Sequence, residues 1–390
     1  MFTLSCIQYN WTFAAKHFLS ILFLTLYSQG LLALERPNPT PFSQVEWQKT
    51  DFAKHSISYD SVVSGGPPKD GIPAIDNPKF DSIRDAQKWL QKLEPVIRLT
   101  HNNEAKAYPI QILMFHEIVN DSIADKKVSV TFCPLCNTSI VFDREVDGRL
   151  LDFGTTGKLR NSDLIMYDRQ TESWWQQFTG EGIVGFYTRH KLIELDSVIL
   201  SFEQFSLLHP NGKVLNRNTG YERQYGNNPY RGYDNINSIP FLMREESDLR
   251  LPPMTRVISL SHLGKTKIYP FSEIKKADIV HDKFAGKSIV IFQTGKIYSA
   301  LDKRKITESR TIKTYRVFST EMNNKFLTFE KKSNKIVDLQ TSSEWNIDGL
   351  AVNGKLKGKR LLPISFGEHF AFAWLAFNPK TEIYRHEQTQ

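Results

Sequence analysis

The residues with the clearest chemical potential are the two cysteines of Cys133-Pro-Leu-Cys136. The residues that follow, 137–142, are mostly β-branched or aromatic, which favours a strand rather than the helix that follows a thioredoxin-type dithiol. Asn137 tolerates the left-handed backbone conformation that a tight turn requires. We therefore interpret this segment as a turn between two strands that directs two sulfurs and several backbone N–H groups toward one point.

Three interpretations of this cysteine pair remain open. Two thiolates on a tight turn suit zinc, copper or iron, and we favour this metal-binding interpretation. Alternatively, the pair is the active dithiol of a thiol-disulfide oxidoreductase, which needs one thiol of lowered pKa and a second thiol that resolves the mixed disulfide. In the third interpretation the chain is a non-enzymatic binding module and the thiols are structural.

A metal site built on this turn needs further ligands, because two sulfurs do not complete a tetrahedral site and the sequence has no second Cys-x-x-Cys. We expect His116 and His209 to supply them. Glu117, next to His116, could orient a ligand or act as a base. The catalytic candidates are accordingly Cys133, Cys136 and Glu117.

A second polar cluster lies in residues 153–163, followed by Met166-Tyr-Asp-Arg169. Its segment Gly154-Thr-Thr-Gly-Lys158 lacks the spacing of a phosphate-binding P-loop and has Leu159 where the hydroxyl residue should stand, which excludes that nucleotide site. We interpret the cluster as a polar hairpin at the mouth of the cysteine site. The residues predicted to bind an anion or polar ligand there are Arg160, Asn161, Ser162 and Arg169.

The chain contains an internal repeat. Residues 96–109 and 257–270 share Val, Ile, Leu, His, Lys, Tyr and Pro in register, at an offset of 161 (257 − 96). Further along, residues 168–175 match residues 338–345. We infer that one domain has been duplicated.

The second copy serves as an internal control, because positions shared by both copies are expected to serve the fold. His101 has its counterpart in His262, so we assign it a structural role. The chemically distinctive residues, in contrast, occur in the first copy alone. Cys133, Cys136, His116, Glu117 and His209 align with Gln293, Lys296, Ala277, Asp278 and Asn378.

The expected fold is mainly β, with two tandem, internally duplicated domains that resemble a β-barrel or β-sandwich. Helices are expected only at residues 81–93 and, as a short helix, within residues 111–117. The predicted parts are a signal peptide (1–34), an irregular lead-in (35–79), a first repeat (80–215), bridging loops (216–250) and a second, degenerate repeat (251–390).

The predicted signal peptide rests on the N-terminal layout. Lys16 and His17 precede an apolar run from Phe18 to Tyr27, and small residues follow at Ser28, Gly30 and Ala33. We therefore expect an exported protein, periplasmic or extracellular, with an uncleaved N-terminal membrane anchor as the alternative.

The charge of the 390-residue chain limits its partners. The net charge is +8, but the basic residues are spread along the sequence without any block of like charges, and no nucleic-acid-binding motif accompanies them. We expect no nucleic-acid partner. A membrane surface or a component of the cell envelope is compatible with the charge, and the sequence leaves the oligomeric state open.

Taken together, these motifs resemble the domain of unknown function 3179 (DUF3179) family. The resemblance implies an exported bacterial or archaeal protein and brings no assigned activity. It covers most of the chain and rests on His116-Glu-Ile-Val-Asn-Asp121, Cys133-Pro-Leu-Cys-Asn-Thr138, Val141-Phe-Asp-Arg144, Gly154 through Ser162, Met166-Tyr-Asp-Arg169, and Thr219-Gly with Pro229-Tyr230.

Overall fold

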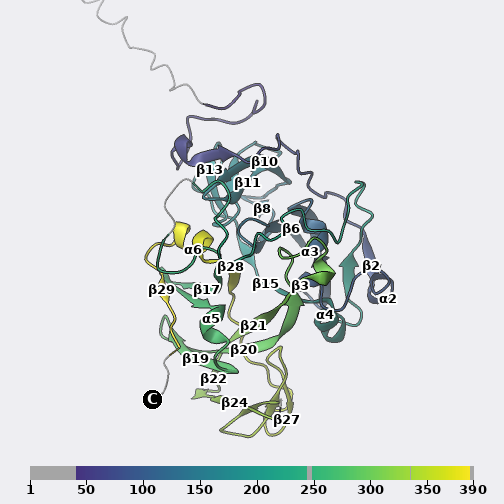
Figure 1. Cartoon of the computed structure of the whole chain (residues 1–390), viewed down its shortest axis with the longest axis vertical. Helices are drawn as coiled ribbons and strands as arrows, with labels where there is room; N and C mark the ends of the chain where they lie inside the picture. Colours follow the sequence, from purple (N-terminus) through teal and green to yellow (C-terminus); the bar gives the residue numbers. More distant parts are fainter. Residues whose placement is uncertain (1–40, 244–247, 334, 387–390) are drawn as a thin grey trace, which may run out of the picture. The chain divides into compact units, whose positions relative to one another are not determined.

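The computed structural model describes residues 41–243, 248–333 and 335–386 (Figure 1). The predicted signal peptide or anchor at residues 1–34 lies outside these residues. Among the helices that are described, none has both the length and the apolar character needed to cross a membrane.

The fold is mainly β, as predicted. Three sheets form the first half of the chain, and the cysteine turn lies in the second of them. The strand order of the first sheet is β15 (Ser197–Ser201), β3 (Pro95–His101), β4 (Glu104–Pro109), β16 (Lys213–Leu215) and β2 (Phe80–Ser82). That of the second is β14 (Glu194–Leu195), β7 (Thr138–Asp143), β6 (Lys126–Cys133) and β5 (Ile118–Ile123). That of the third is β1 (Val62–Ser64), β10 (Phe153–Arg160), β11 (Asp163–Asp168), β12 (Trp174–Gln176) and β13 (Glu181–Val184).

Each of these sheets has a counterpart in the second half with a corresponding strand order. The counterpart of the first sheet is β28 (Gly367–Phe370), β17 (Arg256–His262), β18 (Lys265–Pro270) and β29 (Glu382–Ile383). That of the second is β19 (Ile279–Phe284), β20 (Lys287–Tyr298) and β21 (Thr311–Ser319). That of the third is β24 (Phe329–Lys332), β25 (Lys335–Asp338), β26 (Glu344–Trp345) and β27 (Ala351–Asn353). Two small hairpins also correspond: β8 (Glu145–Val146) with β9 (Arg149–Leu150), and β22 (Glu321–Met322) with β23 (Lys325–Phe326).

Side-chain hydrogen bonds repeat along with the strands. The indole nitrogen of Trp175 donates to Asp168 Oδ2 at 2.9 Å, and that of Trp345 donates to Asp338 Oδ2 at 3.0 Å. The sandwich-like description fits this arrangement, and no sheet of the described chain closes into a barrel. Ser43–Gln390 forms one compact unit, and the domain boundaries stay a prediction.

The helices are few and short. They are α2 (Ile83–Ala86), α3 (Ile110–Leu113), α4 (Phe202–Leu208), α5 (Phe271–Ile274) and α6 (Ala371–Phe377), with 3-10 turns η1 (Tyr59–Ser61) and η2 (Ile306–Glu308).

The helix predicted at residues 81–93 is therefore wrong beyond its first turn. The Ser82 hydroxyl caps α2, while the Asp81 carboxylate accepts hydrogen bonds from Trp89 Nε1 at 2.9 Å and Asn216 Nδ2 at 2.9 Å. These tertiary contacts hold the segment in turns after Ala86.

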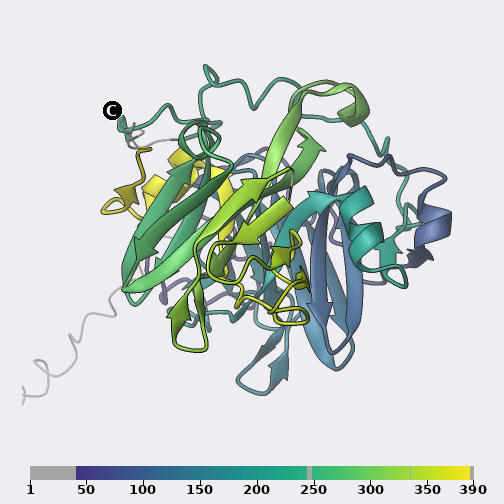
Figure 2. The same ribbon diagram turned by 90° about the horizontal axis from the view of Figure 1, so that it is seen from below.

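The two halves share one core. The largest cluster of buried apolar side chains contains Phe132 and Cys136 from the first half and Phe370 and Phe372 from the second. Figure 2 shows the paired strands β20 and β21, in green, next to strands of the first half in blue and teal. The second half thus packs directly against the sheets that carry the cysteine turn.

Candidate functional site

The cysteines lie on a turn between two paired strands, as the sequence predicts. Cys133 ends β6 and pairs with Thr138, the first residue of β7. Asn137 takes the left-handed conformation (φ 52°) and its N–H donates to the Pro134 carbonyl oxygen at 3.3 Å. Both thiols are free and buried, with exposed fractions of 1% for Cys133 and 0% for Cys136.

A second hairpin, from another sheet, faces this turn. β10 and β11 are joined by Asn161 and Ser162, which both have positive φ (52° and 60°), as a two-residue type I′ turn requires. The carbonyl oxygen of Ser162 lies 3.3 Å from Cys136 Sγ and 4.0 Å from Cys133 Sγ. Asp163, the first residue of β11, follows directly.

Cys133, Cys136 and Asp163 form a group of possible metal ligands. One ligand atom from each lies within 4.8 Å of the other two, and all three residues are buried. Asp163 is a residue that the sequence reasoning missed, although it belongs to the polar cluster already singled out. The internal repeat held a signal for it, because the offset that aligns Asp168 with Asp338 places Ser333, which is not a carboxylate, opposite Asp163.

The Asp163 carboxyl is held firmly. Its Oδ2 accepts hydrogen bonds from Gln176 Nε2 at 2.7 Å and from the Phe178 N–H at 2.9 Å. Burial raises the pKa of Asp163 to about 6, and these two donors oppose the rise. The second oxygen, Oδ1, is buried and has no nitrogen or oxygen donor within the described part of the chain, while the two thiols hydrogen-bond to the carboxyl. It is therefore available to a cation or a proton.

The electrostatics of the group are those of a cluster of acids. Burial raises the pKa of Cys133 and raises that of Cys136 further, and the charge of Asp163 acts in the same direction on both. Glu117 also raises the pKa of Cys133. Since burial and neighbouring acids both disfavour the thiolates, the group is costly to ionise without a compensating cation.

Glu117 stands beside this group. It lies between α3 and β5 with φ 59°, and its carbonyl oxygen accepts a hydrogen bond from the Phe132 N–H at 2.8 Å, next to Cys133. Glu117 is 7% exposed, and its carboxyl has no hydrogen-bond or ion-pair partner among the described residues. Burial, together with the charge of Asp163, raises its pKa to about 8. An acid in this position can bind a ligand or exchange a proton at neutral pH.

The hydrogen bonds of His116 lead away from the cysteine group. Its Nδ1 lies 2.8 Å from the Pro73 carbonyl oxygen and its Nε2 lies 2.6 Å from the Tyr225 hydroxyl, which in turn lies 2.6 Å from Thr219 Oγ1. Both ring nitrogens are thus engaged, and His116 is not a member of the group of possible ligands. It ties the bridging loops to the first half instead.

His209 is also outside that group. It follows α4 and its ring lies tilted against that of Phe205, with ring centroids 5.3 Å apart. Burial lowers its pKa, and the charge of Arg98 lowers it further.

The four residues predicted to bind a polar ligand are only partly brought together. Arg169 pairs with Asp76 at 2.7 Å, and Arg160 lies 3.5 Å from Gln176 Oε1 and 5.4 Å above the Phe377 ring. Asn161 and Ser162 form the turn that faces the thiols.

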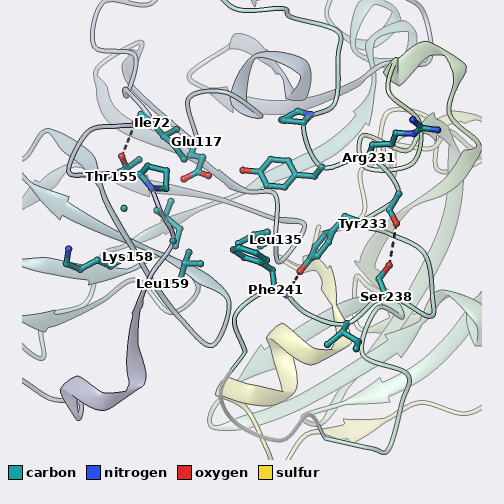
Figure 3. A pocket seen from close by; sticks show the side chains of 18 of the residues that line it. Ile72, Glu117, Leu135, Thr155, Lys158, Leu159, Arg231, Tyr233, Ser238 and Phe241 are labelled. Carbon is teal, nitrogen blue, oxygen red and sulfur yellow. Dashed lines mark hydrogen bonds between the residues drawn. The ribbon is translucent and has the colours of Figure 1, made fainter.

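A cavity of about 830 Å³ adjoins the group (Figure 3). Leu135, between the two cysteines, and Leu164, after Asp163, both line it, and Glu117 contributes a carboxyl. The remaining walls come from residues 65–72, from β10 and from residues 229–241 of the bridging loops. The candidate site is therefore a buried cluster of two thiols and a carboxyl next to an open, largely apolar space.

Comparison with known proteins agrees with the resemblance seen in the sequence. A family model described as "Protein of unknown function (DUF3179)" matches residues 69–381, most of the chain. No curated protein and no solved structure matches it.

Proposed function

We propose that this chain, which belongs to the DUF3179 family, binds a transition-metal ion through Cys133, Cys136 and Asp163. The observation that carries the proposal is the convergence of these three buried ligand atoms within 4.8 Å, from two separate hairpins. The second half of the chain, with Gln293 and Lys296 at the cysteine positions, lacks this ligand set.

The need for charge compensation supports a cation. Two thiolates and a carboxylate are costly to bury together, and their raised pKa values reflect this cost. A divalent ion would offset the cost of burying these charges, because it stabilises deprotonated sulfur and oxygen ligands. Asp163 Oδ1 has the freedom to serve as the third ligand.

Among zinc, copper and iron, zinc is the ion to test first. It accepts mixed sulfur and oxygen ligands in tetrahedral geometry, and its catalytic sites combine three protein ligands with one open position. Cys133, Cys136 and Asp163 would hold the ion, and Glu117, which lies outside this group and lines the adjoining cavity, could exchange a proton there. Such a site would supply a Lewis acid next to a titratable carboxyl.

The oxidoreductase alternative has less support. An attacking thiol needs exposure and a lowered pKa, whereas both thiols are buried and their pKa values are raised. The binding-module alternative, with purely structural thiols, differs from metal binding in a measurable way: it predicts that their replacement changes stability and leaves the metal content unchanged.

The decisive experiment compares the metal content of three proteins after zinc loading and dialysis: the wild type, Cys133→Ser/Cys136→Ser, and the matched control Gln293→Ser/Lys296→Ser in the second half. We expect about one zinc ion per chain in the wild type and the control, and less than about a tenth of that in the cysteine variant. Circular dichroism verifies that all three are folded. Equal, near-zero zinc in the wild type and the cysteine variant would refute the proposal.

A further inference from the structure

We propose that the cavity beside the cysteine turn is a binding site for an uncharged small molecule with an apolar body and a single hydrogen-bonding group. This inference goes beyond metal binding and rests on different observations, namely the walls of the cavity and two polar groups that face it without partners.

The walls are mainly apolar. Ile72, Leu135, Leu159 and Leu164 come from the first half, and Pro229, Ile239 and Phe241 come from the bridging loops. At about 830 Å³ the space falls within the range of small-molecule sites, which are typically lined by apolar and aromatic side chains with a few polar groups. The apolar surface favours a ligand whose body can replace water there.

Two polar groups stand unpaired at this cavity. The Glu117 carboxyl, 7% exposed, points into the space in Figure 3. The hydroxyl of Tyr230, which also lines the cavity, has no hydrogen-bond partner among the described residues. Because neither group is engaged within the described part of the chain, both can bond to a ligand's hydrogen-bonding group.

The charges argue for an uncharged molecule. Lys158 and Arg231 line the cavity, but Figure 3 shows their charged ends directed away from its centre. The charge of Asp163, which helps to raise the pKa of Glu117, disfavours an anion at the inner end. A cation would find one carboxyl but mostly apolar walls, where a charge is costly.

The bridging loops complete the site. Pro229, Tyr230 and Tyr233 line the cavity, and the loops are fixed by Tyr225, which bonds to His116, and by Asp234, which pairs with Arg256 at 3.1 Å. The cavity is thus bounded on one side by the sheets and on the other by an anchored loop, and it remains open to solvent at Ile239.

The test uses N-phenyl-1-naphthylamine, an uncharged fluorophore with an apolar body and one N–H donor, titrated into the full chain. The matched variants are Ile239→Asp, which places a charge at the exposed rim of the cavity, and Leu263→Asp in the turn between β17 and β18. The two side chains are similarly exposed, at 84% and 85%. We expect saturable binding by the wild type and Leu263→Asp, and binding weaker by at least about tenfold in Ile239→Asp.

The hydrogen-bonding group is tested by displacing the probe with 1-naphthol and with naphthalene. In the wild type we expect 1-naphthol to bind about threefold to tenfold more tightly, and the preference to vanish in Glu117→Leu. Leucine has the same Cβ as glutamate, so the positive φ at residue 117 adds no new backbone strain.

All titrations are repeated with Cys133→Ser/Cys136→Ser, so that the cavity and the metal are judged separately. Probe binding that persists without zinc supports the cavity site even if the metal proposal fails. No saturable binding by the wild type, or equal weakening by Ile239→Asp and Leu263→Asp, overturns the cavity site. If Glu117→Leu still prefers 1-naphthol to naphthalene as strongly as the wild type does, Glu117 is not the group that bonds to the ligand.

Discussion

The backbone N–H of Phe370 donates a hydrogen bond of 2.9 Å to the carbonyl oxygen of Cys136. Phe370 ends β28, in the second half of the chain, and its neighbour His369 places Nδ1 2.8 Å from Thr138 Oγ1. The half that lacks the thiols therefore holds the turn that carries them. The second half therefore contributes to the cysteine site by contact, although it has other residues at the cysteine positions.

Asp163 can be tested directly as the third ligand. Asp163→Asn keeps the size of the side chain and removes its charge, so we expect the affinity for zinc to fall by at least about 100-fold. Competition with a chromophoric chelator measures the change. Asp147→Asn, at an acid that is 66% exposed, is the control and should retain wild-type affinity. Wild-type affinity in Asp163→Asn would remove this residue from the site.

Zinc affinity should depend on pH. Burial raises the pKa values of both thiols, so at neutral pH protons occupy the two sulfurs that zinc needs deprotonated. Binding must release them, and the affinity should rise by about tenfold to 100-fold for each pH unit if one or two protons leave. Calorimetry in two buffers of different ionisation enthalpy counts the released protons. A constant affinity between pH 6 and pH 8 would contradict the proposed ligands.

His369 should make the fold sensitive to acid. Burial lowers the pKa of His369 from 6.5 to about 3, so between these values the unfolded chain binds a proton that the folded chain does not. The contribution of His369 to the free energy of unfolding is therefore fully present above pH 6.5. It is lost as the pH falls toward 3, by up to about 1.4 kcal/mol per pH unit.

The matched variant is His369→Gln, which cannot be protonated. At pH 7.5 we expect it to be less stable than the wild type by about 1–3 kcal/mol, because His369 also bonds to Ser259 Oγ at 2.9 Å. The difference should narrow at pH 5. Urea unfolding at both values measures it, and other titrating groups cancel in the comparison. A difference independent of pH would mean that His369 does not titrate in this way.

A variant of His116 shows whether this residue fixes the bridging loops or binds zinc. In His116→Ala the contact with Tyr225 is lost, so the bridging loops should be cut faster by a protease while zinc affinity stays within about threefold of the wild type. Limited proteolysis followed by mass spectrometry locates the cuts, and the chelator assay gives the affinity. A loss of affinity as large as that of Asp163→Asn would restore His116 as a ligand.

The local features of the chain were predictable from its sequence. The β-branched runs on either side of Cys133 and Cys136 predicted the strands β6 and β7, and Asn137 marked the left-handed residue of the turn. Such features depend on neighbours along the chain. The paired Asn-Asn at residues 102–103 likewise marks the hairpin of β3 and β4.

The site depends on contacts between distant segments, which the sequence reasoning did not capture. Asp163 meets the thiols because the β10–β11 hairpin packs against a different sheet, an arrangement that spacing along the chain does not specify. His116 was predicted as a ligand because the second copy has Ala277 at its position, a difference that a residue with a structural role can also show. Its partners, Pro73 and Tyr225, became visible only in the folded chain.

Leu135 has a consequence for how the two proposed sites would communicate. It sits between the cysteines, so its side chain faces the cavity while its neighbours hold the thiols. An occupant of the cavity would press on the same four-residue turn that sets the distance between the sulfurs. If that contact changes the affinity for metal by some factor, thermodynamic reciprocity requires the metal to change the affinity for the occupant by the same factor.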